Sequence, residues 1–381
     1  HYEYGSFGLL KTLTRPDGQC YHFIYDGLTR LKQVINAAGE CWTYTLDAAG
    51  QLISETDFSG RTLRYEYDAA GRRTATHYPD SHIIREYYDS GDRILQRQVR
   101  QRREEAEQII STTDFRYDAE CRLISACTPD SRVEFEYDAD GQGIAETING
   151  RRLEHRYDPL SGRPVAWQLD DVAVQFTHGV MGRITHWQIN DHLPLQFSHD
   201  ALGRETTRHS EAGFQHGQSY SPVGNIVEQW AGHHEPGTTD WPMDIWRRQE
   251  YDRTWNLTRV SDNRWGTTTY RYDSNDQITL AEGGTRQLPR QERFDYDINL
   301  NISHHGQTRN LTDALMQFTA QEQEHGRIAK RGDSRFRYDE GGRLVEKNVL
   351  SDGFRPQRWR YRWDGMGQLI QHITPQGERW Q

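Results

Sequence analysis

The chain has 381 residues and a formal net charge of −10, and its 46 Lys and Arg are outnumbered by 56 Asp and Glu. This acidic balance disfavours nucleic-acid binding, which needs a basic surface, and no apolar run approaches the roughly 20 residues of a membrane span. Only 34% of the residues are hydrophobic, yet 11 Trp, 20 Tyr and 12 Phe argue against disorder. The composition therefore favours a thin β-sheet that is wet on at least one face.

The N-terminal part of the chain introduces a repeat whose anchor is the second residue of a Tyr-Asp pair. Asp26, Asp47, Asp68 and Asp89 lie 21 residues apart. Two strands and two turns fill a repeat of this length, as in an all-β array. Each repeat is therefore predicted to form one β-hairpin.

The third repeat shows the chemistry of the unit, TLRYEYDAAGRRTATHYPDS from Thr62 to Ser81. Alternation along the first strand places both of its tyrosines on one face, opposite Arg64 and Glu66. The carboxylate of Asp68 can accept backbone N–H groups and open a turn. Gly71 can then supply the positive φ of a type I turn with a bulge.

The pattern continues to the C-terminus with variable spacing. Further anchors are Asp118, Asp138, Asp158, Gly179, Asp200, Ser221, Asp252, Asp273, Asp297, Gln323, Asp339 and Asp364. The residues that define the repeat most clearly are Tyr25, Asp26, Arg30, Tyr67, Asp68, Gly71, Arg72, Tyr137, Asp138, Gly141, Tyr157, Asp158, Tyr338, Asp339, Gly342 and Arg343.

This number of anchors predicts roughly 30 strands. One continuous sheet of that size would measure ~145 Å along its hydrogen-bonding direction. Rolled into a single turn it would be ~46 Å across, which is too wide for facing side chains to fill. The strip is therefore expected to enclose space or to lie over something.

Two steps between anchors are longer than the rest and predict insertions near 95–112 and 229–246. The first, rich in charge, could be a short helix or an extended hairpin, and a solvated protrusion is favoured over a docking site. The second contains Trp241 and Trp246, which could contact a partner or enclosed cargo, although packing against the sheet is favoured.

No set of side chains predicts catalysis, metal binding or a cofactor. The adjacent histidines at 233–234 and 304–305 lack the ligand number and spacing of a zinc site. The anchor aspartates are explained by their turns. Cys20 and Cys41 occupy equivalent positions of successive repeats, about 9–10 Å apart, so they are expected to be free.

The motif Tyr-Asp-x-x-Gly-Arg-Leu with a period near 21 resembles that of the YD-repeat, or Rhs, family. The resemblance rests most clearly on three segments, Tyr338–Leu344, Tyr67–Arg72 and Tyr25–Leu31. It extends over essentially the whole chain. Members of this family include bacterial Rhs toxins, the C component of insecticidal Tc toxins and animal teneurins. The resemblance implies a spiralling antiparallel sheet that forms the wall of a hollow shell.

For function, the resemblance implies containment. The chain is expected to be a single shell segment, 1–381, that sequesters a C-terminal toxin domain and is delivered into target cells, often by type VI secretion. Implied partners are the remaining shell segments, the toxin domain, secretion needle-tip proteins and a chaperone. The protein would reside in the bacterial cytoplasm before it is secreted or injected.

The sequence also departs from the toxin-type pattern. The Asp-Pro motif that carries the self-cleaving aspartates of such toxins is not found, so no catalytic residue is carried over and the chain is not expected to be an enzyme. Gly377–Trp380 matches Gly60–Leu63 and predicts another anchor near position 385. The alternative function is a cell-surface adhesin that binds carbohydrate or cell wall through its aromatic repeats.

Overall fold

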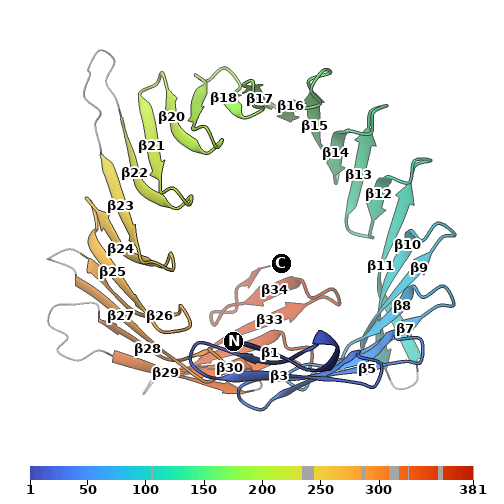
Figure 1. The fold of residues 1–381 in the computed structure, drawn as a ribbon. Helices are drawn as coiled ribbons and strands as arrows, with labels where there is room; N and C mark the ends of the chain where they lie inside the picture. The colour runs from blue at the N-terminus through green and yellow to red at the C-terminus, as the bar shows by residue number, and fades with distance from the viewer. Residues whose placement is uncertain are drawn as a thin grey trace.

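The computed structural model describes residues 1–103, 106–233, 244–284, 289–308, 317–324, 326–350 and 355–380. Within these residues the protein is one sheet of 35 strands, drawn in Figure 1, with a single 3₁₀ turn at Ser6–Gly8. Each strand pairs antiparallel with the next strand along the chain. The predicted all-β array of hairpins is confirmed. More strands form than the roughly 30 expected, because nearly every anchor is flanked by two complete strands.

The strands of the first half of the sheet are β1 (Tyr2–Tyr4), β2 (Leu10–Thr14), β3 (Cys20–Tyr25), β4 (Leu31–Ile35), β5 (Cys41–Leu46), β6 (Leu52–Thr56), β7 (Thr62–Tyr67), β8 (Arg73–His77), β9 (His82–Tyr88), β10 (Ile94–Arg103), β11 (Ala106–Tyr117), β12 (Leu123–Cys127), β13 (Arg132–Tyr137), β14 (Gly143–Ile148), β15 (Arg151–Tyr157), β16 (Pro164–Leu169), β17 (Val172–His178) and β18 (Ile184–Ile189).

The strands of the second half are β19 (Leu195–His199), β20 (Glu205–Ser210), β21 (Phe214–Tyr220), β22 (Ile226–His233), β23 (Ile245–Tyr251), β24 (Leu257–Asp262), β25 (Gly266–Tyr272), β26 (Ile278–Gly284), β27 (Pro289–Tyr296), β28 (Ile302–Thr308), β29 (Gln317–Glu324), β30 (Arg327–Arg331), β31 (Ser334–Tyr338), β32 (Leu344–Val349), β33 (Gln357–Trp363), β34 (Leu369–Ile373) and β35 (Arg379–Trp380).

The turns that begin at the anchors lie along one edge of the sheet, and we call them YD turns. In the turn between β7 and β8, Gly71 N donates to Asp68 O at 3.0 Å and Asp68 N donates to Arg72 O at 3.0 Å. Gly71 has φ = 82°. The register then shifts between Glu66 and Tyr67, so a β-bulge follows the turn. Bulges increase local twist, and their recurrence helps a long strip to coil.

The opposite edge carries the turns that send the chain back, which we call return turns. The return turn between β2 and β3 has the same hydrogen-bond geometry, with Gly18 N donating to Arg15 O at 3.0 Å. Ser81, which replaces glycine in a later return turn, also has a positive φ of 65°. Some return turns therefore share the design of the YD turns, whereas those at 149–150, 170–171 and 332–333 are shorter turns of two residues.

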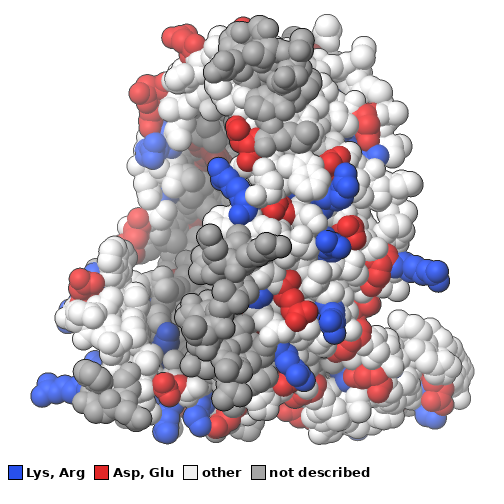
Figure 2. All heavy atoms as spheres, turned by 90° about the vertical axis from the view of Figure 1, so that its left-hand side faces the viewer, with Lys and Arg blue, Asp and Glu red and all other residues white. Residues whose placement is uncertain are grey.

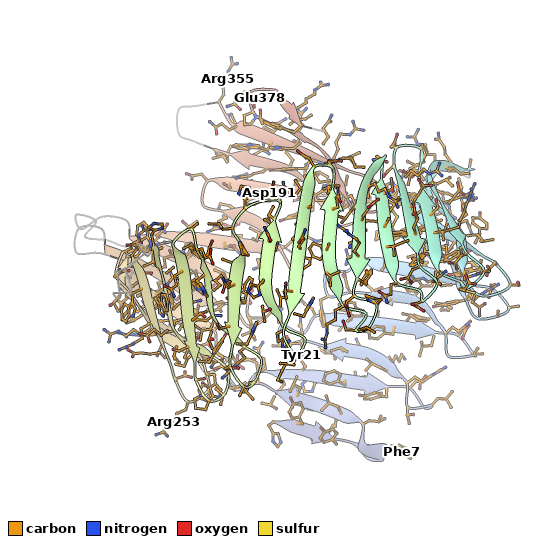
Figure 3. The ribbon with its side chains drawn as sticks, turned by 90° about the horizontal axis from the view of Figure 1, so that it is seen from above. Phe7, Tyr21, Asp191, Arg253, Arg355 and Glu378 are labelled. Carbon is orange, nitrogen blue, oxygen red and sulfur yellow. The ribbon has the colours of Figure 1, made fainter. Side chains whose placement is uncertain are left out.

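The strip coils through more than one full turn. Strands β1, β3 and β5 occupy the same side of the ring as β30, β33 and β34 in Figure 1. From above, the N-terminal strands lie at one end of the spiral and the C-terminal strands at the other (Figure 3). Strand number alone suggested a strip rolled into a single turn. The structure has more than one turn, because the sheet rises along the axis of the spiral and its edges meet.

The meeting edges form a polar seam, which we define by contacts between return turns of the first winding and YD turns of the second. Asn275 Nδ2 donates to Asp17 Oδ2 at 2.9 Å, and Asn299 Nδ2 donates to Glu40 Oε2 at 3.0 Å. These partners are 258 and 259 residues apart. Further seam contacts join Arg15 to Ile298, Arg61 to Gly341, and Arg343 to Asp80.

The wall has little conventional core, because it is one layer thick. Its buried hydrophobic residues are Ala75, Ile83, Val99, Ala145 and Ala166. Ile83 is the largest side chain that is fully buried among the described residues. Stability must therefore come from neighbour-to-neighbour contacts along the strip, as in other repeat proteins.

The insertion near 95–112 is an extended hairpin and contains no helix in its described residues. It is formed by β10 and the long strand β11, which remain paired from Gln96–Asp114 to Arg103–Ala106. The insertion near 229–246 extends β22 and leads into β23, and residues 234–243 lie outside the described part of the chain.

Candidate functional site: a two-faced wall of repeats

The anchor aspartate organises its own turn through both carboxylate oxygens. Asp68 Oδ1 accepts the N–H groups of Ala70 at 2.9 Å and Arg72 at 3.0 Å. Its Oδ2 accepts Arg72 Nε at 2.7 Å. The backbone N–H of Arg72 is the main cause of a lowered pKa for Asp68, and the guanidinium adds to it. The aspartate therefore keeps its charge for a structural purpose.

The repeat arginine joins one turn to the next. Arg72 Nη1 donates to Asp89 O at 2.9 Å, and its guanidinium lies over the ring of Tyr88 at 5.0 Å. Arg122 repeats both contacts with Asp138 and Tyr137. The carbonyl contact also recurs from Arg30 to Asp47, Arg204 to Ser221, and Arg343 to Asp364.

The repeat tyrosine reaches back to the preceding repeat. Tyr67 Oη donates to Leu52 O at 2.8 Å, and Leu52 lies at the bulge that follows the previous YD turn. The same contact is made by Tyr25, Tyr88, Tyr117, Tyr137, Tyr157, Tyr220, Tyr251, Tyr272, Tyr296 and Tyr338. Trp363 makes it with its indole N–H. Each aromatic donor thus satisfies a carbonyl at the bulge.

Not every repeat uses the full set of residues. Asp138 accepts the N–H groups of Asp140 and Gln142, and Gly141 has φ = 85°. The turn at Asp158 is one residue longer, and its carboxylate instead accepts Ser161 N and Oγ. The complete arrangement is present in the turn that begins at Asp339. Asp339 accepts the N–H of Arg343 and pairs with its guanidinium at 2.8 Å, and Gly342 has a positive φ of 86°.

The two faces of the wall differ in character. In β7, Tyr65 and Tyr67 are half-buried, whereas Arg64 and Glu66 are exposed. The same alternation ends β3, β15, β17, β31 and β33, and β13 follows it over its last three residues. We call the side that carries Tyr65 and Tyr67 the tyrosine face and the other side the polar face. Apolar and aromatic side chains are thereby concentrated on one surface of a single-layer sheet.

An aromatic ladder crosses the tyrosine face from β15 to β18. The His155 and Trp167 rings lie edge-on at 6.1 Å, Trp167 and Phe176 at 4.8 Å, and Phe176 stacks on Trp187 at 6.5 Å. Trp167 and Trp187 remain 41% and 38% exposed. This ladder offers flat apolar surface to a ligand as well as to its neighbours.

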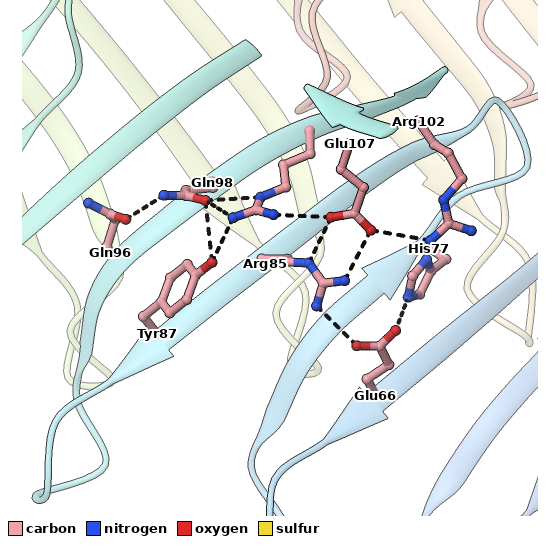
Figure 4. Close-up of polar contacts among 9 residues, drawn as sticks. Glu66, His77, Arg85, Tyr87, Gln96, Gln98, Arg102 and Glu107 are labelled. Carbon is pink, nitrogen blue, oxygen red and sulfur yellow. Dashed lines mark hydrogen bonds and ion pairs between the residues drawn. The ribbon is translucent and has the colours of Figure 1, made fainter. Parts of the chain in front are cut away.

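A charged network on the polar face binds the long β10–β11 hairpin to β9 (Figure 4). Glu107 accepts Arg85 through two bonds of 3.1 Å, Arg100 at 3.1 Å and Arg102 at 3.2 Å. Arg85 also binds Glu66, which contacts His77. Hydrogen bonds from Arg85, Arg102 and Arg100 lower the pKa of Glu107 to about 2. The hairpin predicted as a solvated protrusion is paired with β9 as far as Gln101, and its charges add side-chain contacts to that pairing.

The sequence suggested that two tryptophans, Trp241 and Trp246, could contact a partner, and the structure describes only the second of them. Trp241 lies outside the described residues. Trp246 is the second residue of β23 and lies opposite Trp230, and its indole N–H donates to Glu228 Oε1 at 2.9 Å. The guanidinium of Arg248 lies 5.4 Å from its ring. Trp246 is thus integrated into the sheet.

Charges of both signs are interspersed over the outer surface seen in Figure 2. In the described residues, no group of three or more His, Cys, Asp or Glu could hold a metal ion. Likewise, the part of the chain that is described contains no helix suited to crossing a membrane. All four cysteines are free thiols. The principal features of this molecule are therefore its repeat network, its two faces and its edges.

Comparison with known proteins decides the family. The model of the RHS Repeat matches residues 25–62 and 47–83. A probable deoxyribonuclease, RhsB of Dickeya dadantii (strain 3937), is 31% identical over 252 residues, which are 62% of this chain and 16% of that protein. The chain is an Rhs/YD-repeat protein. RhsA of the same strain, also named a probable deoxyribonuclease, is 33% identical over 202 residues, 52% of this chain and 13% of its own.

The Rhs fold of this chain also matches a solved toxin structure. The Tc holotoxin pore of Photorhabdus luminescens aligns over 98% of the chain and 23% of its own with a TM-score of 0.76 at 13% identity. That likeness concerns the fold. The chain spans about a sixth or less of the length of the curated Rhs relatives, whose names describe whole proteins.

Proposed function

We propose that this chain forms part of the wall of a toxin shell and that the shell sequesters a C-terminal toxin domain of the same protein. The observation that carries the proposal is the closed seam: the Rhs strip winds past a full turn and bonds to its own edge. A strip that only displayed ligand sites would not need to close on itself. The wall itself supplies containment, and no catalytic role is assigned to its residues.

The size of the winding supports a cargo that is not compactly folded. The turn between β2 and β3 meets the turn between β25 and β26, so one winding takes about 23 strands. At ~4.8 Å per strand its diameter is ~35 Å between opposite backbones, and side chains reduce the free width to ~25 Å. A folded domain of about 100 residues is ~34 Å across. An extended or partly folded chain fits this width better.

The test uses the protein as its gene encodes it. We expect a C-terminal toxin segment to resist protease under native conditions and to become cleavable when the wall is unfolded. Cryo-EM should show density inside the wall. Cleavage of that segment at equal rates in the two conditions, together with an empty interior, would contradict sequestration.

The route of delivery is a separate part of the proposal. We propose that a bacterium holds the protein in its cytoplasm, where a chaperone assists it, and then exports it through needle-tip proteins of a type VI secretion system. Export should then stop when the contractile sheath of that system is deleted and resume when the sheath is restored. Unchanged export from the sheath mutant would contradict this route while leaving sequestration intact.

The exposed aromatic ladder supports a second candidate, an adhesin that binds carbohydrate or cell wall. Trp167 and Trp187 could stack on sugar rings, as flat aromatic faces do. Purified cell wall should then sediment the protein, and Trp167→Ala with Trp187→Ala should abolish sedimentation. Trp265→Ala, which alters an exposed Trp away from the ladder, provides the control.

A further inference from the structure

Five arginines lie on the polar face of the C-terminal strands, Arg335 and Arg337 in β31 and Arg358, Arg360 and Arg362 in β33. They occupy alternate positions of their strands, which places them on one face of the sheet. All five are exposed, and the side chains of Arg337, Arg358 and Arg360 are 68%, 51% and 58% exposed. We call this set the arginine patch.

The arginine patch surrounds a single carboxylate, that of Glu346 in the intervening strand β32. The register places Glu346 between Arg337 and Arg360. Its Oε2 lies 3.7 Å from Arg337 Nη2, 3.7 Å from Arg358 Nε and 4.0 Å from Arg360 Nε. Three arginines therefore share one negative charge, and all three distances are too long for hydrogen bonds.

The other two arginines of the patch, Arg335 and Arg362, form no ion pair with any described residue. Five positive charges thus lie around one negative charge, although the whole chain has a net charge of −10. In β15, by contrast, Arg152 binds Glu136 at 2.9 Å and Glu154 at 3.0 Å. Like charges close together in a sheet are destabilising, so an anionic partner would stabilise this part of the wall.

The spacing of the arginine patch matches an extended polypeptide. Arg358, Arg360 and Arg362 stand two residues apart, which is ~6.8 Å along β33. The row on β31 runs beside them at ~9.6 Å, and the shorter side chains of Glu346 and Asn348 lie between the two rows. An extended polypeptide repeats every ~6.8 Å on each of its sides. Asp or Glu at every second residue therefore matches the spacing of the guanidinium groups.

The position of the aromatic side chains favours a polypeptide over a nucleic acid. Guanidinium groups bind carboxylates and phosphates equally through paired hydrogen bonds. A single-stranded nucleic acid also uses aromatic side chains on which its bases stack. The aromatic residues of β33, Trp359, Tyr361 and Trp363, lie on the tyrosine face, behind the patch. The arginine patch therefore offers charge without a stacking surface for bases.

We propose that the arginine patch binds an extended acidic segment of a partner polypeptide, with Asp or Glu at every second residue. Its carboxylates pair with the guanidinium groups of the two rows and supply the counter-charge that Glu346 alone does not provide. The inference does not depend on what the wall encloses or on how the protein is exported.

Peptide binding to the protein as its gene encodes it tests the proposal. The probe is a fluorescent peptide in which Asp and Ser alternate, and the comparison peptide has the same composition with the aspartates in pairs. We expect fluorescence anisotropy to show at least threefold tighter binding of the alternating peptide, and weaker binding at higher ionic strength. Failure of the alternating peptide to bind, or equal affinity for the two peptides, would overturn the proposal.

A matched pair of variants locates the binding. Arg335→Gln with Arg362→Gln should weaken binding of the alternating peptide at least tenfold, and it breaks no ion pair within the described wall. The control is Arg271→Gln with Arg293→Gln, because these exposed arginines of the polar face have carboxylates 3.7 and 3.5 Å away. It should leave the affinity unchanged.

Other anions provide the decisive alternatives. Equal loss of affinity in the two variants would show that the peptide responds to general charge and not to the patch. Tighter binding of an oligothymidylate of equal charge than of the alternating peptide would assign the patch to nucleic acid. Binding to phosphatidylserine vesicles without binding to the peptide would assign it to a membrane surface.

Discussion

At the scale of the residue, the Rhs motif is a set of hydrogen-bond positions. The aspartate closes its own turn, the arginine reaches the next turn, and the tyrosine reaches the previous one, as seen for Asp68, Arg72 and Tyr67. Glycine is the least demanding member. Thr29, Cys121 and Leu300 take its place with φ values of 64°, 67° and 67°. A repeat can therefore lose its glycine at the cost of strain.

Removal of the Tyr67 hydroxyl tests the contact between repeats. Tyr67→Phe leaves Leu52 O without its donor, which should cost about 1 kcal/mol of local stability. Hydrogen exchange should therefore be about fivefold faster in β6 and β7, with little change in distant strands. Tyr4→Phe, at a 61% exposed tyrosine, is the control. Equal effects of the two substitutions would refute the role given to the hydroxyl.

At the scale of the element, the long β10–β11 hairpin shows how an insertion is accommodated. Its strands stay paired beyond the normal repeat length, and Glu107 joins them to β9 through Arg85. Charges on an isolated protrusion would contribute little. Here Arg85, Arg100 and Arg102 all bind the carboxylate of Glu107. These charged side chains help to attach the hairpin to the wall and also keep its surface polar.

Acid should weaken this attachment. The pKa of Glu107 is lowered from 4.5 to about 2 in the folded protein, so its contribution is complete above pH 4.5 and is lost as the pH falls towards 2. We expect hydrogen-exchange protection of β10 and β11 to decline in that range. Glu107→Gln should lower protection at pH 7 and flatten its pH dependence.

The control for this experiment is Glu120→Gln, because Glu120 is an exposed carboxylate with one longer contact, 3.3 Å, to Arg122. It should leave the β10–β11 profile unchanged. A Glu107→Gln variant that keeps the full decline between pH 4.5 and pH 2 would show that other carboxylates control the hairpin.

At the scale of the whole molecule, closure depends on contacts between residues about 260 positions apart. Asn299 binds Glu40 and also accepts Ala38 N–H at 3.3 Å. Individually such contacts at the edge of the sheet are weak, but they recur along the seam. The seam therefore sets the alignment of the windings, while the pairing of neighbouring strands provides most of the stability.

Asn299→Ala should loosen the seam locally. We expect hydrogen exchange in residues 36–40 to be about fivefold faster, because two contacts worth about 1 kcal/mol together are lost. Asn301→Ala is the matched control, since Asn301 lies in the same turn and its side chain bonds only within that turn, to Asp297. If both variants changed residues 36–40 equally, the loss would reflect the turn and not the seam.

Local sequence determined the hairpin. The Asp68 turn, the positive φ near Gly71 and the separation of Tyr67 from Glu66 all follow from chemistry within a few residues, and the family followed from their repetition. The network of Glu107 could not be predicted, because it joins strands whose facing positions depend on the length of one insertion.

Only the tertiary structure decided what the repeats build together. Asn299 lies in the seam and Leu202 is exposed, although both residues stand two positions after an anchor in hairpins of the same design. Their surroundings differ because twist and axial rise accumulate over a whole winding before the edges meet. The sequence was thus sufficient to predict the short-range hydrogen bonds. The closure of the wall depends instead on many small rotations between neighbouring strands, which add up over a whole winding.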